Sequence, residues 1–452
     1  MYEAFDPETF RRQGRAVVDR LADHLAACDA RALPVLPWME PRANVQAWTD
    51  DFTGGADPVT LFGRVIDGAT HLQHPGFVGH QVTSPLPVGA IATLVSGLLN
   101  NGAAVYEMGP VTTAMERVLA AYLARKLGYP ASADGVFTSG GSLGNLTALL
   151  AARAHAKLGE NERGAVLACE EAHYSTARAV RIMGWGEGGL VKVPADERFR
   201  MRVDCLAEAH AAAIRDGRRV VAVVASACST STGAFDPLTE IADFCAEHGI
   251  WMHVDGAHGA SFALSPKHRG LLRGIERADS VVWDAHKMML CPALITAVLF
   301  KRSADSFLAF HGTEAAYLLN EEEEIDSALR VVECTKQMLV LPLYAALAVH
   351  GEGMIGNYLD AIIDLAHDFA RTLRATPDFE VAVAPECNIV CFRHREDDER
   401  QERIRRTLLE DGSFYIVKTR LRGKTYLRTT LINPRTTADD LARLVTAIRA
   451  VP

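Results

Sequence analysis

The sequence predicts an α/β fold whose large domain is built on a mostly parallel sheet. From about residue 135, short apolar runs alternate with stretches of helical periodicity, the order expected of strands joined by crossover helices. The runs are nearly continuous in apolar residues, as in strands that are buried on both faces of a sheet. They are Ala165–Cys169, Val220–Ala225, Ile250–Val254, Ser280–Trp283 and Ala293–Phe300.

The composition indicates a large core and an acidic surface. The 452 residues are 49% hydrophobic and carry a net charge of −9, enough for one large domain and one or two smaller ones. The acidic balance offers no basic surface for nucleic acid or an anionic membrane, and no run approaches the ~18 apolar residues of a membrane span. The nine cysteines contain no Cys-x-x-Cys pair, which favours reduced thiols over a disulfide framework or a zinc site. With no signal-like N-terminus, these features predict a cytoplasmic protein.

The first 70 residues predict an N-terminal arm. Apolar residues recur at helical spacing from about residue 8 to 28, with Pro7 near the start, which predicts an amphipathic helix. Residues 29–60 are rich in proline and tryptophan and lack periodicity, so we expect an extended connector. Such an arm needs a surface to lie on, in its own subunit or in another.

Between the arm and the sheet, the sequence predicts a loop and a helix. The loop runs from His71 to Gln81, and no cysteine or carboxylate stands at ligand spacing from its histidines. A polar pocket wall is therefore favoured over a metal site, and we predict no metal. The apolar periodicity of Val111–Leu127 predicts a core-facing helix, which Gly128 and Pro130 end.

Beyond about residue 340, the pattern is typical of a separate, smaller α+β domain. It predicts a long helix at Met354–Thr372, a strand at Ile389–Phe392, a charged stretch and a final strand at Tyr426–Leu431. We therefore predict an N-terminal arm and connector over residues 1–70, a large domain over 71–340 and a small domain over 341–452.

Unusual polar clusters follow four of the predicted strands. They are Glu170–His173, Ser226–Thr230, Asp255–His258 and Asp284–Lys287. Ligand sites in open parallel sheets lie outside the carboxyl ends of the strands. Because these ends share one edge of the sheet, we expect the four clusters to line a common site.

The segment Thr138–Ser142 leads directly into a helix of apolar periodicity. Its glycines allow close backbone approach, Ser142 is placed to cap the helix, and the helix N-terminus favours a phosphate. The segment is neither Gly-x-Gly-x-x-Gly nor a Walker A loop, which disfavours dinucleotides and nucleoside triphosphates.

These features together match the needs of pyridoxal 5'-phosphate. Lys287 follows a buried strand and is a candidate to form a Schiff base, which requires lowering its pKa from about 10.4. Asp255 would keep the pyridine nitrogen protonated, so that the ring accepts the electron pair left when a bond at the amino-acid Cα breaks. His173 would cover one face of the ring and Ala257 is small enough to pack on the other.

The chain resembles the group II pyridoxal-phosphate decarboxylases, which include glutamate, sulfinoalanine, diaminobutyrate and aromatic amino-acid decarboxylases. The resemblance runs from about His74 to Leu347 and again over Tyr426–Thr436. Its most specific motifs are Tyr106–Pro110 with Met115-Glu116, the Ser-Gly-Gly-Ser loop, Ala172–Ser175, Gly233–Leu238, His253–Ala257 and Asp284–Met289.

The resemblance implies an aspartate-aminotransferase-like fold (fold type I) and an obligate homodimer with active sites at the interface. It implies catalytic roles for Lys287, His173 and Asp255. The cofactor-binding residues that it implies are Gly141, Ser142, His173, Ser229, Asp255, Ala257, Asp284, His286 and Lys287. Arg428 matches an arginine that in some relatives meets a substrate carboxylate, and we expect His80, Gln81 and Tyr317 beside the substrate as well.

The chain departs from the family where a mobile-loop tyrosine helps protonate Cα after carbon dioxide leaves. Residues 318–330 contain no tyrosine, and Tyr317 matches a structural tyrosine at the start of that loop. An electron pair that is not protonated promptly is able to react with oxygen. A second departure is Val78-Gly79-His80-Gln81, where the glycine leaves room for a bulkier side chain or an amino-acid unit on a larger metabolite.

The sequence thus predicts decarboxylation of an L-amino acid or an amino-acid-bearing metabolite. Decarboxylation-dependent oxidative deamination to an aldehyde is the nearest alternative, and β-elimination on a cysteine-type substrate is third. A non-catalytic pyridoxal-binding protein is the weakest alternative, because Lys287, Asp255 and His173 are all present. We expect neither a nucleic-acid nor a membrane partner.

Overall fold

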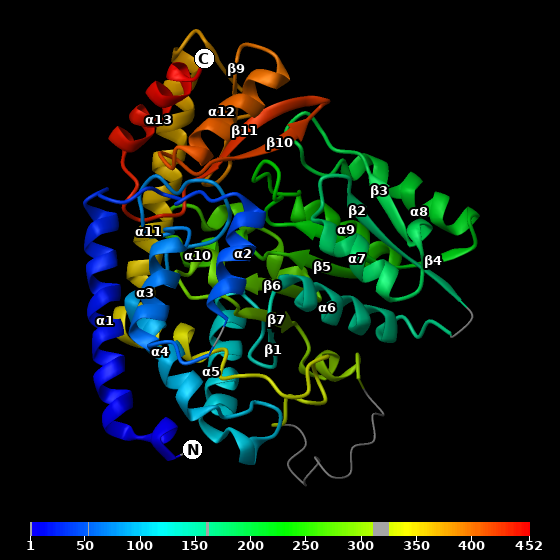
Figure 1. Cartoon of the computed structure of the whole chain (residues 1–452). Coiled ribbons are helices and arrows are strands. Elements are labelled where there is room, and N and C mark those ends of the chain that lie inside the picture. Colours follow the sequence, from blue (N-terminus) through cyan, green and yellow to red (C-terminus); the bar gives the residue numbers. More distant parts are fainter. Residues whose placement is uncertain (1, 53, 160–161, 311–324) are drawn as a thin grey trace. The chain divides into compact units, whose positions relative to one another are not determined.

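The computed structural model describes residues 2–52, 54–159, 162–310 and 325–452, and Figure 1 shows their arrangement in helices and strands. The chain forms two compact units. Unit 1 comprises residues 1–80, 367–382 and 390–452, and unit 2 comprises residues 81–366 and 383–389. The three-part division expected from the sequence stays a prediction.

Unit 2 is built on a seven-stranded sheet of order β1-β7-β6-β5-β4-β2-β3. Its strands are β1 (Asp134–Thr138), β2 (Arg163–Cys169), β3 (Leu190–Val193), β4 (Arg218–Ser226), β5 (Trp251–Asp255), β6 (Ser280–Asp284) and β7 (Thr296–Phe300). The five strands from β3 to β6 pair in parallel, whereas β7 runs antiparallel to both β6 and β1. The mostly parallel sheet is confirmed. The antiparallel direction of β7 was not predicted, because a run of apolar residues does not indicate whether the strand pairs parallel or antiparallel.

Helices pack on this sheet and carry the site residues to its edge. They are α5 (Pro110–Leu127), α6 (Gly141–His155), α7 (Tyr174–Ile182), α8 (Leu206–Arg215) and α9 (Leu238–His248). Helix α6 packs on β6, β7 and α7. Its apolar residues share one hydrophobic core with residues of β2, β4, β6 and β7. A Cβ at Gly144 would lie 3.0 Å from the Thr296 side chain. The glycine therefore lets the start of α6 approach the strands closely.

A buried ion pair holds α5 against the end of β1. Lys336 Nζ lies 3.0 Å from Glu116 Oε2 and donates a hydrogen bond of 2.8 Å to the Phe137 carbonyl. Burial raises the pKa of the Glu116 carboxyl, and the Lys336 charge opposes this shift. Since Phe137 precedes the Thr138–Ser142 segment, the pair anchors the strand that leads into it.

Unit 1 contains helices and an antiparallel sheet. The helices are α1 (Pro7–Asp29), α2 (Pro41–Asp51), α3 (Pro58–Gly68), α12 (Asp398–Glu410) and α13 (Ala438–Ala450). The sheet has the order β10-β11-β9-β8, with strands β8 (Phe379–Val381), β9 (Ile389–His394), β10 (Val417–Leu421) and β11 (Lys424–Thr430). The helix predicted at residues 8–28 and the two predicted strands are confirmed.

The extended connector predicted for residues 29–60 is wrong over α2 and the first turn of α3. Each helix has a proline as its first residue, where a missing N–H costs nothing. The Glu40 and Asp57 side chains accept hydrogen bonds from the backbone of Ala43 and Thr60 and so cap the helices. The prolines start these helices instead of excluding them.

Three further helices complete the described chain: α4 (Pro87–Leu99), the short α10 (Ala285–Met288) and α11 (Leu341–Ala375). Helix α11 contains the predicted helix at 354–372, and Gly351 interrupts it with a φ of 73°. Within the described ranges, no helix is long and apolar enough to cross a membrane.

We expect Lys336→Met to lower the free energy of unfolding by about 3–5 kcal/mol, because it leaves the Glu116 carboxylate buried without its cation. Lys126→Met is the matched control. It removes a pair with the half-exposed Glu352 and should cost less than about 1 kcal/mol. Urea unfolding followed by circular dichroism measures both, and equal losses would contradict a stabilising role for the buried pair.

Candidate active site

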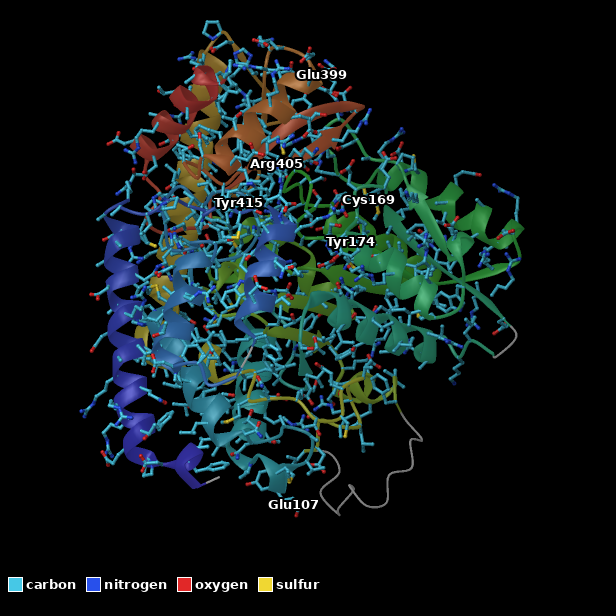
Figure 2. The ribbon with its side chains drawn as sticks, viewed as in Figure 1. Glu107, Cys169, Tyr174, Glu399, Arg405 and Tyr415 are labelled. Carbon is cyan, nitrogen blue, oxygen red and sulfur yellow. The ribbon has the colours of Figure 1, made fainter. Side chains whose placement is uncertain are left out.

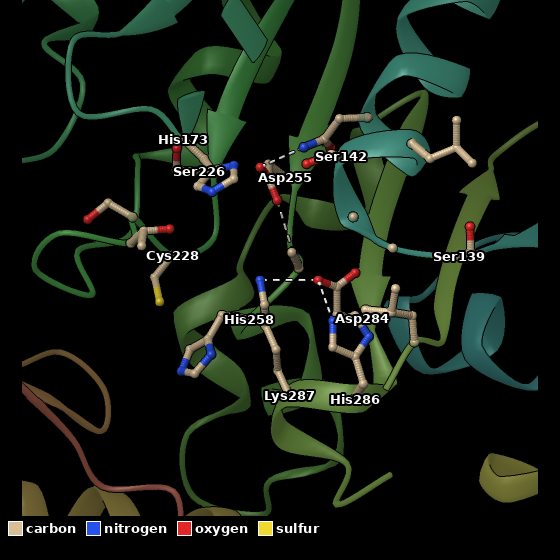
Figure 3. A pocket seen from close by; sticks show the side chains of 18 residues that line it. Ser139, Ser142, His173, Ser226, Cys228, Asp255, His258, Asp284, His286 and Lys287 are labelled. Atoms are coloured by element: carbon tan, nitrogen blue, oxygen red, sulfur yellow. Dashed lines mark hydrogen bonds and ion pairs between the residues drawn. The ribbon is translucent and has the colours of Figure 1, made fainter. Parts of the chain in front are cut away.

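A cavity of about 380 Å³ opens at the carboxyl ends of β2, β4, β5 and β6. Figure 3 shows the side chains that line it. Every residue predicted to bind the cofactor lies in its wall: Gly141, Ser142, His173, Ser229, Asp255, Ala257, Asp284, His286 and Lys287. The structure thus brings the four strand-end clusters and the glycine loop to one place, while their individual roles stay predictions.

The buried carboxylate of Asp284 holds the lysine end of the cavity. Lys287 Nζ lies 3.1 Å and His286 Nε2 lies 3.6 Å from Asp284 Oδ2. On the other side, Thr296 Oγ1 donates to Asp284 Oδ1 at 2.6 Å. A Cβ at Gly141 would lie 2.9 Å from Asp284 Oδ2, so the carboxylate requires a glycine at that position.

The charge of Lys287 is set by two opposing effects. Burial lowers the pKa of its amine, but the Asp284 and Asp255 carboxylates outweigh burial and raise the pKa above its usual value. Burial alone therefore does not neutralise this lysine. The protonated amine is held in a fixed position beside Asp284.

Asp255, the last residue of β5, is held by two donors. Asn145 Nδ2 donates to Asp255 Oδ2 at 2.9 Å, and the Ala257 backbone N–H donates to Oδ1 at 3.2 Å. Asn145 lies on α6, one turn beyond Gly141. Asp255 is 8% exposed and lines the cavity.

A chain of hydrogen bonds behind Asp255 fixes the orientation of Asn145. Asn145 Oδ1 lies 2.9 Å from His253 Nε2, His253 Nδ1 lies 2.8 Å from Ser280 Oγ, and Trp251 Nε1 donates to that hydroxyl at 2.8 Å.

The proton positions along this chain follow from its two ends. An ionised carboxylate only accepts, so Asn145 presents its amide nitrogen to Asp255 and its oxygen to His253. His253 then carries hydrogen on Nε2 and accepts on Nδ1 from Ser280, which accepts from Trp251. Burial holds the pKa of His253 below its usual value, which keeps the ring neutral. Every hydrogen bond in this series, from Trp251 to Asp255, therefore donates in the direction of the Asp255 carboxylate.

His173 precedes α7 and is oriented from the same asparagine. The Ser175 backbone N–H donates to His173 Nδ1 at 3.3 Å, the Ser175 hydroxyl lies 2.8 Å from that nitrogen, and Asn145 Nδ2 donates to the hydroxyl at 2.9 Å. Because Nδ1 accepts, the hydrogen of the neutral ring is on Nε2. Burial lowers the pKa of His173, and the charge of Asp255 opposes the shift.

The N-terminus of α6 forms the third side of the cavity. Ser142 was predicted to cap this helix, but the cap is Gly140, with a φ of 127°, and no side chain of the described residues caps it. The Ser142 side chain lines the cavity instead. An uncapped helix N-terminus beside small residues is a favourable place for a phosphate.

The predicted substrate-binding residues are in other parts of the chain. Gln81 belongs to unit 2 but is not one of the described residues that line the cavity. His80 and Arg428 belong to unit 1, where Tyr415, labelled in Figure 2, packs against the His80 ring with a centroid distance of 5.6 Å. Burial and the charges of Arg428 and Arg405 lower the pKa of His80. Tyr317 lies outside the described residues.

Asn145, His253, Ser175 and Ser280 were not predicted as site residues, although His253 and Ser175 stand in motifs of the family resemblance. His253 stands two residues before Asp255 and Asn145 four residues after Gly141, so side-chain periodicity places each on the same face as a recognised residue. That periodicity could have identified them.

Comparison with known proteins agrees with this geometry. Residues 63–395 match the family model described as the pyridoxal-dependent decarboxylase conserved domain. The chain is 28% identical to the aromatic-L-amino-acid decarboxylase of Bacillus atrophaeus, over 98% of this chain and 95% of that protein. It is 32% identical to human cysteine sulfinic acid decarboxylase, over 73% and 69%. The crystal structure of mouse CSAD superposes with a TM-score of 0.90 at 26% identity, covering 99% of each chain.

The lysine, the supported carboxylate and the open helix N-terminus fit the aldehyde, pyridine nitrogen and phosphate of pyridoxal phosphate. The fold is that of the fold type I pyridoxal-phosphate enzymes. Within that class, the chain belongs to the pyridoxal-dependent decarboxylase family. It is a carboxy-lyase that uses pyridoxal phosphate to decarboxylate an amino acid.

We expect Asn145→Ala to weaken cofactor binding roughly 10- to 150-fold, because a hydrogen bond to a buried charged group contributes about 1.5–3 kcal/mol. Visible absorbance of the bound cofactor, followed during dialysis, measures the loss. Asn101→Ala, which removes an exposed amide, is the control. Equal cofactor retention in both variants would contradict the role of Asn145 in holding Asp255.

Proposed function

We propose that Lys287, Asp255 and His173 carry out the decarboxylation. The observation that carries the proposal is the convergence of Lys287 with the Asn145-supported Asp255 in one cavity. Pyridoxal phosphate supplies an electron sink for the pair of electrons left at Cα when the carboxylate departs. Lys287 provides the amine that holds the cofactor and is exchanged for the substrate amine.

The other residues hold the reacting groups in place. Asp255 keeps a proton on the pyridine nitrogen, and the directed chain from Trp251 holds Asp255 in position. His173 would cover one face of the bound ring, and the small Ala257 would pack on the other. Gly141, Ser142 and His286 would hold the phosphate, with Ser229 near the ring hydroxyl or the phosphate. Asp284 holds Lys287 until its amine is deprotonated for exchange.

The fate of the electron pair at Cα separates two outcomes. Protonation gives the amine. With oxygen as the acceptor, two electrons reduce it to hydrogen peroxide, and hydrolysis by water releases an aldehyde and ammonia. Residues 318–330 contain no tyrosine, and none of the described residues that line the cavity is a tyrosine. These observations favour the aldehyde-forming outcome as a second candidate.

The substrate class is proposed as L-amino acids. The room expected beside Gly79 is not open, because a Cβ there would lie 2.6 Å from the Tyr415 ring. Relatives at similar identity carry different substrate names, among them aromatic amino acids, cysteine sulfinic acid and L-2,4-diaminobutyrate. Family membership therefore does not select a side chain. A panel of these amino acids is the direct test.

We expect one member of the panel to give carbon dioxide in air and under nitrogen, and Lys287→Ala to give none. Amine equal to carbon dioxide in both atmospheres supports simple decarboxylation. Aldehyde and peroxide that disappear under nitrogen support the oxidative outcome. Mass spectrometry with a peroxide assay measures all products. A keto acid released from a cysteine-type substrate without carbon dioxide would contradict both and indicate β-elimination.

We also propose a homodimer with active sites at its interface. Helix α4 exposes one apolar face: Ile91 is 60%, Leu94 50% and Leu98 65% exposed. These residues repeat at intervals of three and four, which places them on one side of the helix. A contiguous apolar face of this kind is typical of a subunit interface.

Sedimentation equilibrium should give the mass of two chains for the unmodified protein and of one chain for Leu94→Glu with Leu98→Glu. The control is Ile214→Glu, which changes a similarly exposed apolar residue on α8 and should leave the dimer intact. A single-chain mass for the unmodified protein would exclude the dimer.

The cytoplasmic location expected from the sequence stays a prediction. Among the described residues none of the nine cysteines forms a disulfide, as is usual in a reducing compartment.

A further inference from the structure

Two thiols and an imidazole meet beside the cofactor cavity. Cys228 follows β4, His258 follows β5, and Cys387 lies in the part of unit 2 that leads into β9. All three side chains are buried, and their ligand atoms lie within 4.8 Å of one another. Cys228 and His258 also line the cavity.

The separation of the two sulfurs distinguishes a shared cation from a disulfide. Cys228 Sγ and Cys387 Sγ are 3.7 Å apart. Two thiolates on a tetrahedral Zn²⁺ with Zn–S bonds of about 2.3 Å lie ~3.8 Å apart. A disulfide needs about 2.05 Å, so the sulfur separation suits a bridging ion and is too long for a disulfide.

The imidazole is oriented as a ligand. His258 Nε2 lies 2.8 Å from Asn388 Oδ1, and Asn388 Nδ2 donates to Met288 Sδ at 3.5 Å. Because the amide nitrogen faces the sulfur, its oxygen accepts from His258 Nε2–H, and the neutral ring carries its lone pair on Nδ1. A hydrogen bond to the far ring nitrogen is the usual support of a metal-binding histidine.

We propose that Cys228, His258 and Cys387 bind one thiophilic divalent cation, with Zn²⁺ as the reference ion. Cys387 Sγ donates to the Gly233 carbonyl at 3.4 Å, and this proton leaves when the thiolate binds the cation. Within the described residues the cluster offers three ligands. Sites with three protein ligands keep a fourth position for water or a substrate group.

The cation site adjoins the proposed reaction centre and does not depend on its activity. In the view of Figure 3, Asp284 and His286 lie on one side of Lys287, while Cys228 and His258 lie on the other. Two ligands thus belong to the cavity wall, and a group entering from the cavity is able to reach the fourth position. A substrate thiol or carboxylate has the required chemistry.

The experiment uses the protein with bound pyridoxal phosphate, freed of excess cofactor and of metal by chelation and dialysis. We expect Zn²⁺ to bind at one ion per chain, measured by elemental analysis after dialysis. Co²⁺ bound at a tetrahedral thiolate site should give an intense absorption band at red wavelengths, where the cofactor does not absorb.

Four variants test the ligand assignment. Cys387→Ser and His258→Ala should each weaken Zn²⁺ binding at least ~100-fold, since losing only an orienting group costs about 10–100-fold. Asn388→Ala should show that smaller loss. Cys245→Ser, which changes another buried thiol, should bind as the unmodified protein does. Cofactor absorbance and circular dichroism establish that each variant is folded.

Binding of less than one ion per chain by the unmodified protein would overturn the proposal. So would Zn²⁺ affinity that is unchanged in Asn388→Ala and in the folded ligand variants. If the protein loses the mass of two hydrogens on mild oxidation and retains no Zn²⁺ after reduction, Cys228 and Cys387 form a redox-active thiol pair and not a cation site. Failure of decarboxylation with stoichiometric Zn²⁺ would reject only the proposed function.

Discussion

The buried carboxylate of Asp284 is the interaction on which the site depends. One side chain ends β6, receives a hydrogen bond from Thr296 of β7, and lies beside Lys287 and His286 of α10. Removing a charge from water is costly unless it is paired and hydrogen-bonded. These partners therefore stabilise the carboxylate, and in doing so they fix the lysine. The same carboxylate leaves no room for a Cβ at position 141, which ties the N-terminus of α6 to the lysine end of the cavity.

A second buried carboxylate, that of Asp255, acts on the same lysine. Its charge and that of Asp284 together raise the pKa of Lys287, so the lysine is held protonated until its proton is removed for reaction. Asp255 is in turn held by Asn145, whose other contacts reach His173 through Ser175. One amide thus couples the carboxylate of Asp255 to the imidazole of His173. Both are oriented by a neutral, directed chain that adds no further charge to the buried site.

The sequence predicted those parts of the fold that depend on local pattern. Strands buried on both faces are nearly continuous in apolar residues, so the central strands β4, β5 and β6 could be recognised and their polar ends assigned to one edge. Strand β1 contains a glycine and β3 is short and half-exposed, and neither resembles a core strand. Helix α2 begins with a proline that usually marks a loop. The direction of β7 depends on how it pairs with β1 and β6, and the residues of the strand do not indicate that direction.

The contacts around the cavity that join distant segments are the ones that sequence pattern describes least. Asn145 supports Asp255 because α6 approaches the sheet at Gly144, and the Cys228–His258–Cys387 cluster forms only when three distant segments meet. On one side of Lys287, Asp284 and His286 come from a single short stretch (Figure 3), which is one of the motifs of the family resemblance. On the other side the residues come from strand ends and from the segment that leads into β9, and there a thiol and an imidazole face the cavity. Since relatives of similar identity are named for different substrates, the motifs that they share do not by themselves select a substrate. Which groups meet the substrate depends also on the spatial assembly of segments that are distant in the sequence.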